Sequence, residues 1–345
     1  MARFGGLVAS GLRDVTSDPA ALDSSGFWAV SADFGGRLVC ARFDTVREAS
    51  VPAPVPGAWR GPGAGDWTSS LDRAAYVAGV RRIRAYIAAG EVYQANLCRV
   101  MTAPLPDPAA ADVDALTSLL ARGNPAPYAG TIRLPAHGVE IATASPELFL
   151  RRDGRTVESG PIKGTGRTED DLLEKDHAEN VMIVDLVRND LGRVCATGSV
   201  TVPDLCVVEK HPGLVHLVST VRGELAEGAG WPELFDAAFP PGSVTGAPKT
   251  SALGIIGELE TAPRGPYCGG IGWVDADRRT ASLAVGIRTF WIDRTGGVPV
   301  LRFGTGAGIT WGSDPGREWD ETELKASRLL AVASGVHEAT GRTAR

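Results

Sequence analysis

Two carboxylates fall within an apolar stripe of one expected helix. The segment from Glu169 to Leu191 follows Thr168, a typical N-cap residue, and precedes Gly192, a typical helix terminator. Five of its residues recur every three or four positions and so share one face, namely Leu172, Asp176, Glu179, Ile183 and Leu186. Because buried carboxylates are costly unless paired, Asp176 and Glu179 are expected to meet a cation, a metal ion or a cavity; the alternative is the solvated edge of the stripe.

A second expected helix carries acids in a similar pattern. Asp314 and Pro315 resemble an N-cap and a first helical residue, and the helix is expected to end near residue 333. Glu318, Glu321 and Lys325 then lie on one face, which alone would usually be solvated. If the two acidic pairs converge, their oxygens could hold an octahedral Mg²⁺ with water completing the coordination, since hard oxygen ligands suit this ion.

Two glycine-rich segments could bring backbone N–H groups to a ligand. PPGSVTGAPKT at 240–250 leads into a helix expected from Pro248 to Glu260, and GTGAG at 304–308 follows an expected strand. The first segment fails the G-x-x-x-x-G-K-[ST] spacing of a P-loop, and Pro248 lacks the N–H that a phosphate cradle needs. Nucleotide binding is therefore disfavoured, whereas a carboxylate would suit the helix N-terminus as well as a phosphate. Plain turns are the alternative for the second segment.

A third segment, ESGPIKGTGR at 158–167, encloses one lysine among isoleucine, glycine and proline. Burial disfavours the ammonium form, so a desolvated lysine at position 163 would be a nucleophile near neutral pH. The alternative interpretation is a surface lysine on a loop.

The pattern of the remaining elements predicts an α+β fold. A further helix is expected after Ser69 and Asp72, which resemble a capping box, and before Gly90. Strand-like runs come in groups between single helices, at Val139–Thr143, Leu148–Arg152, Val200–Val202, Leu205–Val208, His216–Val221, Thr280–Ile292 and Val300–Phe303. Such grouping is typical of large, mostly antiparallel sheets packed with helices.

The composition excludes several classes of protein. With 35 Lys and Arg against 41 Asp and Glu, the net charge is −6 and no basic run exceeds two residues, so nucleic acid is not an expected partner. The five cysteines contain no C-x-x-C pair, which argues against a disulfide framework or zinc site and favours a reducing cytoplasm. The sequence has no 18-residue apolar stretch and no signal-peptide core, so neither a membrane nor export is expected.

A connector is expected near the N-terminus. The stretch VPAPVPGAWRGPGAGD at 51–66 holds four prolines and four glycines, which support neither a helix nor a central strand. We therefore expect a short leading segment with its connector at residues 1–66 and one catalytic domain at 67–345.

These segments together resemble the chorismate-utilising enzymes, whose members include anthranilate, aminodeoxychorismate, isochorismate and salicylate synthases. The resemblance covers roughly residues 68–335. It is carried by YQANL at 93–97, SPELF at 145–149, PIKGT at 161–165, AENVMIVDLVRNDLGRV at 178–194, HLVSTVRGEL at 216–225, GSVTGAPK at 242–249, IRT at 287–289, GAGI at 306–309 and the helix with Glu318, Glu321 and Lys325.

PIKGT resembles the large, chorismate-binding subunit of aminodeoxychorismate synthases, because anthranilate synthases usually have alanine in place of Lys163. The resemblance implies that Lys163 attacks C2 of chorismate as the C4 hydroxyl leaves, and that ammonia from a separate glutamine amidotransferase subunit then adds at C4. It implies that Glu147 is the general acid. Gln94 agrees with this branch, because water-using relatives have a lysine base there and an amide cannot activate water.

The resemblance also implies a Mg²⁺ site and a substrate pocket. Glu179 and Glu321 are the expected metal ligands, and Asp176 and Glu318 are expected to reach the ion through water. The expected substrate-binding residues are Gly164, Thr165, His216, Thr245, Cys268, Arg288, Gly306, Ala307, Gly308 and Lys325. Cys268 departs from the tyrosine of anthranilate synthases, and His216 could alternatively be a core histidine.

The alternatives are anthranilate or isochorismate synthesis and, from a different class, a non-catalytic chorismate-binding or scaffold subunit.

Overall fold

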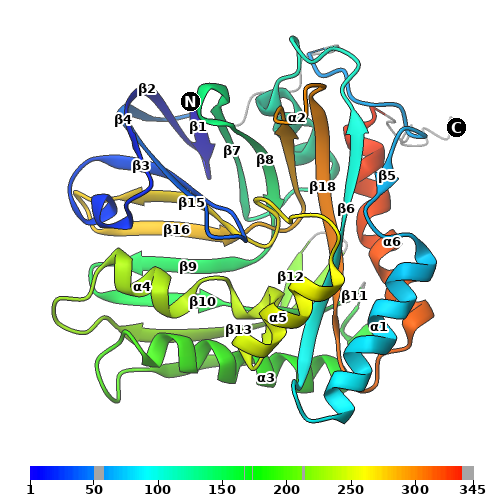
Figure 1. The fold of residues 1–345 in the computed structure, drawn as a ribbon. Coiled ribbons are helices and arrows are strands. Elements are labelled where there is room, and N and C mark those ends of the chain that lie inside the picture. The colour runs from blue at the N-terminus through cyan, green and yellow to red at the C-terminus, as the bar shows by residue number, and fades with distance from the viewer. Residues whose placement is uncertain (50–57, 167, 173, 212–213, 336–345) are drawn as a thin grey trace, which may run out of the picture.

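The computed structural model describes residues 1–49, 58–166, 168–172, 174–211 and 214–335. Figure 1 shows one curled sheet with helices packed around it. Across these residues the sheet has 18 strands, and each pairing between them is antiparallel. The strands are β1 (Ala2–Phe4), β2 (Leu7–Thr16), β3 (Phe27–Ala32), β4 (Leu38–Glu48), β5 (Thr68–Ser69), β6 (Gln94–Pro104), β7 (Tyr128–Leu134), β8 (Val139–Ser145), β9 (Leu148–Asp153), β10 (Thr156–Gly160), β11 (Ile162–Gly166), β12 (Thr201–His211), β13 (Leu214–Glu224), β14 (Gly246–Ala247), β15 (Gly270–Asp275), β16 (Thr280–Val285), β17 (Thr289–Asp293) and β18 (Val300–Ile309).

The pairings form one continuous path through the sheet. It runs β12–β13–β10–β9–β16–β15–β3–β4–β2–β1–β7–β8–β17–β18–β6, with β11 on β13 and both β5 and β14 on β6. The expected α+β fold with large antiparallel sheets is confirmed.

The helices cover particular strands. They are α1 (Arg73–Ala88), α2 (Val113–Gly123), α3 (Glu174–Gly192), α4 (Trp231–Ala238), α5 (Lys249–Leu259) and α6 (Pro315–Ala333), with short 3-10 turns at Pro19–Asp23, Pro135–His137, Glu169–Asp171 and Gly242–Val244. Helices α1 and α6 pack on each other and on the β6–β18 pair, whereas α3 packs on β11, β12 and β13. No helix within these described ranges is long and apolar enough to cross a bilayer.

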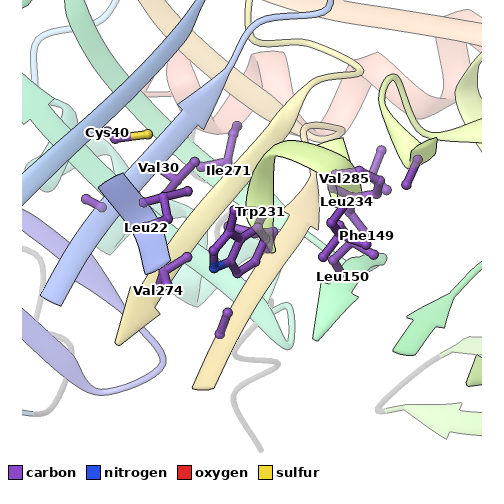
Figure 2. Close-up of a cluster of buried hydrophobic side chains, with 14 of the residues drawn as sticks. Leu22, Val30, Cys40, Phe149, Leu150, Trp231, Leu234, Ile271, Val274 and Val285 are labelled. Carbon is purple, nitrogen blue, oxygen red and sulfur yellow. The ribbon is translucent and has the colours of Figure 1, made fainter. Parts of the chain in front are cut away.

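The main apolar core joins buried side chains of α3 and α4 with those of β3, β9, β15 and β16. Figure 2 shows Trp231 of α4 among Leu22, Val274 and Leu234. A second cluster packs α2 and α6 against β8, β17 and β18, and a third packs α1 and α5 against β6 and β18. Both smaller clusters therefore pack helices against β18, the strand that contains the glycine-rich run at 304–308.

The N-terminal segment is built into the same sheet as the rest of the chain. Strand β1 pairs with β7, and β3 pairs with β15. Within the expected connector, residues 51–57 lie outside the described residues, while the Trp59 indole N–H donates to the carbonyl of Ala333 at 2.7 Å. This bond ties the end of the connector to the end of α6.

Two expected helix starts differ in the structure. Asp72, not Ser69, caps α1, because its Oδ1 accepts from the amide of Ala75 at 2.7 Å while Ser69 lies in β5. The expected helix from residue 169 to 191 is also interrupted. Thr168 and Asp171 cap only the 3-10 turn, Leu172 is extended, and α3 begins at Glu174, so Leu172 does not belong to the stripe on α3.

Two expected strands were also wrong in extent. The run expected from Thr280 to Ile292 is divided into β16 and β17, because the backbone of Arg288 adopts φ of 51° between them. The runs expected at residues 200–202 and 205–208 form one strand, β12, whose register shifts twice. Helices α2 and α4 were not expected, although Trp231-Pro232 at the start of α4 is a typical N-terminal signal.

Glycine substitutions test the close packing of β18. A Cβ at Gly304 would lie 2.1 Å from Cγ of the Tyr267 ring, whereas one at Gly254, in the middle of α5, would contact nothing within 4 Å. Gly304→Ala is expected to lower the free energy of unfolding by about 3 kcal/mol, since overpacking displaces a buried ring. Gly254→Ala, the matched control, is expected to raise it by about 0.5–1 kcal/mol. Urea denaturation measures both, and equal effects would contradict the packing argument.

Candidate active site

Lys163 and Glu147 lie together beside the loop that carries Ser243. Glu147 stands directly before β9, and Lys163 lies on β11 with its Nζ donating to the carbonyl of Ser243 at 3.3 Å. Burial raises the pKa of Glu147 to about 7, although hydrogen bonds from the Ser243 hydroxyl and the backbone of Ile162, together with the charge of Lys163, act in the opposite direction. Glu147 is therefore able both to give and to accept a proton near neutral pH.

The acids of α3 and α6 influence one another electrostatically. Burial raises the pKa of Glu179, the charges of Asp176 and Glu321 raise it further, and Lys163 and Lys175 lower it. Glu179 and Glu321 therefore interact electrostatically and are both influenced by the charge of Lys163, while their convergence into one metal site stays a prediction.

Lys325 links α6 to the glycine-rich strand. Its Nζ lies 2.6 Å from Oε1 of Glu321 and donates to the carbonyl of Gly306 at 3.2 Å. Burial opposes ionisation of Glu321, but Lys325, Lys175 and Lys163 hold its pKa below the usual value. Burial raises the pKa of the neighbouring Glu318.

The donor chemistry of the four acids fits Mg²⁺. Within the described residues no three His, Cys, Asp or Glu side chains are already gathered into a ligand cluster. Carboxylates on two separate elements nevertheless share one electrostatic environment, with Asp176 and Glu179 on α3 and Glu318 and Glu321 on α6. Such oxygen donors are those that Mg²⁺ prefers, usually with several waters retained.

Glycines bring the backbone close to these acids. Gly164 has φ of 68°, and a Cβ there would lie 3.0 Å from Cβ of Asp176, so β11 passes directly against α3. Gly306, Ala307 and Gly308 belong to β18 itself instead of a loop after it. A Cβ at Gly306 would lie 2.5 Å from Sγ of Cys98, so only glycine permits this spacing of β18 and β6.

The half-buried Arg288 and the buried Gln94 each have polar atoms without a partner among the described residues. The Arg288 guanidinium makes no hydrogen bond or ion pair with the described residues, and burial alone lowers its pKa. Gln94 is fully buried, and its Nε2 donates to Oδ1 of Asn96 at 3.2 Å while its Oε1 accepts nothing. The orphaned acceptor of Gln94 is costly in a folded protein unless a ligand satisfies it, and the half-buried Arg288 guanidinium keeps its donors available for an anion.

The other expected pocket residues have these positions. Thr245 is buried, and its hydroxyl donates to the carbonyls of Pro241 and Gly242 at 3.2 Å. His216 is buried on β13, and its backbone pairs with that of Thr165 on β11. Cys268 is fully buried with φ of 64°, and its thiol contacts that of Cys98 behind Gly306.

Two residues of this region, Ser243 and Lys175, were not assigned a role from the sequence. Ser243 contacts Glu147 and Lys163, and its carbonyl also accepts from Nδ2 of Asn96 at 3.4 Å. Its place in a glycine-rich loop was the available signal. The charge of Lys175 lowers the pKa of Glu179 on α3 and of Glu321 on α6. Its position one helical turn before Glu179 was a signal that the two side chains are neighbours.

The raised pKa of Glu147 predicts a pH-dependent stability. A pKa near 7 against 4.5 in the unfolded chain corresponds to a penalty of about 3 kcal/mol when the carboxyl is ionised. The penalty is complete above pH 7 and is relieved as the pH falls toward 4.5, because the folded chain takes up the proton first. Glu147→Gln is therefore expected to raise the free energy of unfolding at pH 8 and to change it much less at pH 5. Equal effects at both pH values in urea denaturation would contradict this.

The sequence matches the model of the family described as chorismate binding enzyme over residues 25–331. Anthranilate synthase component 1 of Streptomyces coelicolor is 40% identical over 314 residues, covering 85% of this chain and 60% of the relative. Aminodeoxychorismate synthase component 1 of Klebsiella aerogenes is 38% identical over 277 residues, covering 76% of this chain and 59% of the relative. The chain thus spans about 60% of the length of these relatives.

Solved structures show the same fold. Anthranilate synthase component I of Streptococcus pneumoniae superposes with a TM-score of 0.74 at 24% identity, covering 89% of this chain and 81% of that one. The menaquinone-specific isochorismate synthase of Escherichia coli gives 0.75 at 19% identity, covering 96% and 87%. Together with the family match over most of the sequence, these findings show that the chain belongs to the chorismate-binding enzymes.

Proposed function

We propose that this protein is the chorismate-binding subunit of an aminodeoxychorismate synthase, converting chorismate and ammonia to 4-amino-4-deoxychorismate. The observation that carries the proposal is the position of Lys163, whose side chain is within electrostatic reach of the buried acid Glu147 and of Glu179 and Glu321. A primary amine beside a carboxyl group that titrates near pH 7 is suited to covalent catalysis with a general acid.

The proposed reaction has two substitutions. The neutral amine of Lys163 forms a bond to C2 of chorismate, the two conjugated ring double bonds each shift by one position, and the C4–O bond breaks. Glu147 gives its proton to the departing hydroxyl, which leaves as water. Ammonia then bonds to C4, the two double bonds shift back, and the C2–N bond breaks to regenerate Lys163. The ionised Glu147 takes the surplus proton from the new ammonium group and is ready for the next cycle.

The unpartnered polar groups are suited to binding a small dicarboxylate as substrate and ammonia as nucleophile. Arg288 offers an uncompensated guanidinium, which suits a carboxylate. The orphaned Oε1 of Gln94 can accept an N–H from ammonia but cannot remove a proton from water. Glu179 and Glu321, aided by Asp176 and Glu318, are the residues that would hold Mg²⁺, which when bound neutralises charge on a substrate carboxylate.

Ammonia is proposed to come from a glutamine amidotransferase subunit, in keeping with the "component 1" in the names of several relatives. Anthranilate synthesis is the principal alternative, because relatives with that name are similarly identical to this chain. Isochorismate synthesis is less well supported, since Gln94 is no general base. A non-catalytic subunit would form no product.

The product formed from chorismate tests the proposal. Incubation with chorismate, Mg²⁺ and an ammonium salt at alkaline pH is expected to give 4-amino-4-deoxychorismate, which chromatography separates from the alternatives. Anthranilate or isochorismate as the main product would overturn the assignment, and the absence of any product would favour the non-catalytic subunit.

Replacement of Lys163 tests its covalent role. Lys163→Ala is expected to lower kcat by about 10²-fold, because only direct ammonia attack is left. Mass spectrometry of the wild-type protein with chorismate but no ammonia should detect an adduct at Lys163 equal to chorismate less one water. Lys210→Ala, which removes a lysine whose side chain is 73% exposed, is the control and should keep both properties. A variant at position 163 with the wild-type rate would remove this lysine from the mechanism.

A further inference from the structure

Arg99 is a fully buried arginine on β6 that is not part of the proposed chemistry. Its side chain is 1% exposed. Its Nε donates to Oγ1 of Thr322 at 3.0 Å, its Nη1 donates to Oγ of Ser69 at 3.1 Å, and its Nη2 forms an ion pair with Glu323. The guanidinium also lies 4.1 Å from the centre of the Trp319 ring.

Three of these partners lie within about one turn of α6. Trp319, Thr322 and Glu323 lie on one side of the helix, next to the face that carries Glu318, Glu321 and Lys325. A lysine could not make these contacts together, because its ammonium is a single point, whereas the planar fork of arginine has five N–H donors in fixed directions. The contacts therefore hold α6 against rotation about its axis.

The strand beside Arg99 fixes the same stretch of helix. Arg99 is paired in register with Thr305 of β18, whose hydroxyl donates to the carbonyl of Thr322 at 3.0 Å. The next residue, Gly306, accepts the hydrogen bond of Lys325. Arg99 thus holds the helix within two residues of the place where it meets the glycine-rich strand.

We propose that Arg99 is a positioning residue, which sets the rotation of α6 so that Glu318, Glu321 and Lys325 face the glycine-rich part of β18. The proposal rests on the proposed function in one respect, that these acids take part in holding Mg²⁺. It does not depend on which product the enzyme forms from chorismate.

The test compares Arg99→Gln with a chemically matched control. Arg152 also combines an ion pair, with Asp23 at 2.7 Å, and a contact over a tryptophan ring, that of Trp231 at 5.7 Å, but it lies on β9 away from α6. Melting temperature is measured during a titration with Mg²⁺ in the presence of chorismate. Arg99→Gln is expected to raise the half-saturating Mg²⁺ concentration about tenfold, as for other residues that orient metal ligands, whereas Arg152→Gln leaves it unchanged.

Kinetics supply a second readout. For Arg99→Gln the KM for chorismate and the Mg²⁺ requirement should rise, while kcat at saturation falls less than about threefold, because ligands are misplaced but no reacting group is lost. Arg99→Lys should give an intermediate Mg²⁺ requirement. If Arg99→Gln does not fold, Glu323→Gln takes its place, since Glu323 is half exposed and the change only weakens the same clamp.

The proposal is overturned if the Arg99→Gln protein, or Glu323→Gln in its place, retains the wild-type Mg²⁺ requirement. It is also overturned if Arg152→Gln shows an equal rise, which would indicate general destabilisation, or if Mg²⁺ does not stabilise the wild-type protein. Anthranilate as the wild-type product, with the shift for Arg99→Gln intact, would reject the proposed function and leave the role of Arg99 standing.

Discussion

The charge of Lys163 acts on three carboxylates at once, and the site depends on that balance. Glu147, Glu179 and Glu321 are each stabilised in their ionised form by this lysine. A nucleophilic lysine must give up its proton, and the acids would then lose a shared counter-charge in a partly buried space. A neutral Lys163 is compatible with these buried acids only under two conditions. Glu147 must carry a proton, as its pKa near 7 allows, and another positive charge must lie beside Glu179 and Glu321. Lys175, Lys325 and the proposed Mg²⁺ meet that second condition.

The same balance explains why the backbone around the site is rich in glycine. Lys163 lies on β11 and the acids lie on α3 and α6, and a Cβ at Gly164 would lie against Asp176 where β11 passes α3. Gly164 lets β11 touch Asp176, and Gly306 lets β18 lie against Cys98 while its carbonyl accepts from Lys325. Part of the high glycine content of the sequence, 43 in 345 residues, thus has a physical reason at the places where charged groups converge.

How much the sequence could predict depended on the range of the interactions. Periodicity and caps correctly predicted α5 and α6 and the antiparallel character of the sheet, because these features arise from local spacing. The break at Leu172 and the kink at Arg288 were missed, since each depends on a backbone conformation that the residue type does not demand. The electrostatic interaction of Glu179 with Glu321 links residues 142 positions apart, and spacing within either helix leaves it undetermined. The family resemblance supplied that long-range information. The contacts of Arg99 could not be anticipated, because an arginine within a strand gives no sign of being buried.

Overall sequence identity cannot decide between products, because two relatives named anthranilate synthase are 41% and 40% identical over the matched residues and one named aminodeoxychorismate synthase is 38% identical. Relatives with the same fold have different names for their products, so we attribute the choice of product to the few side chains that are proposed to touch the reacting atoms. Three such groups have distinct chemistry here. Glu147 can protonate a leaving hydroxyl, Gln94 presents an acceptor without basicity, and Lys163 offers an amine. The acid Glu147 suits each of the alternative reactions, and Gln94 disfavours water as the nucleophile. Only Lys163 distinguishes between the two reactions that use ammonia. In the proposed mechanism, the choice between the two amino products therefore depends on Lys163, which donates to the carbonyl of Ser243 beside Glu147.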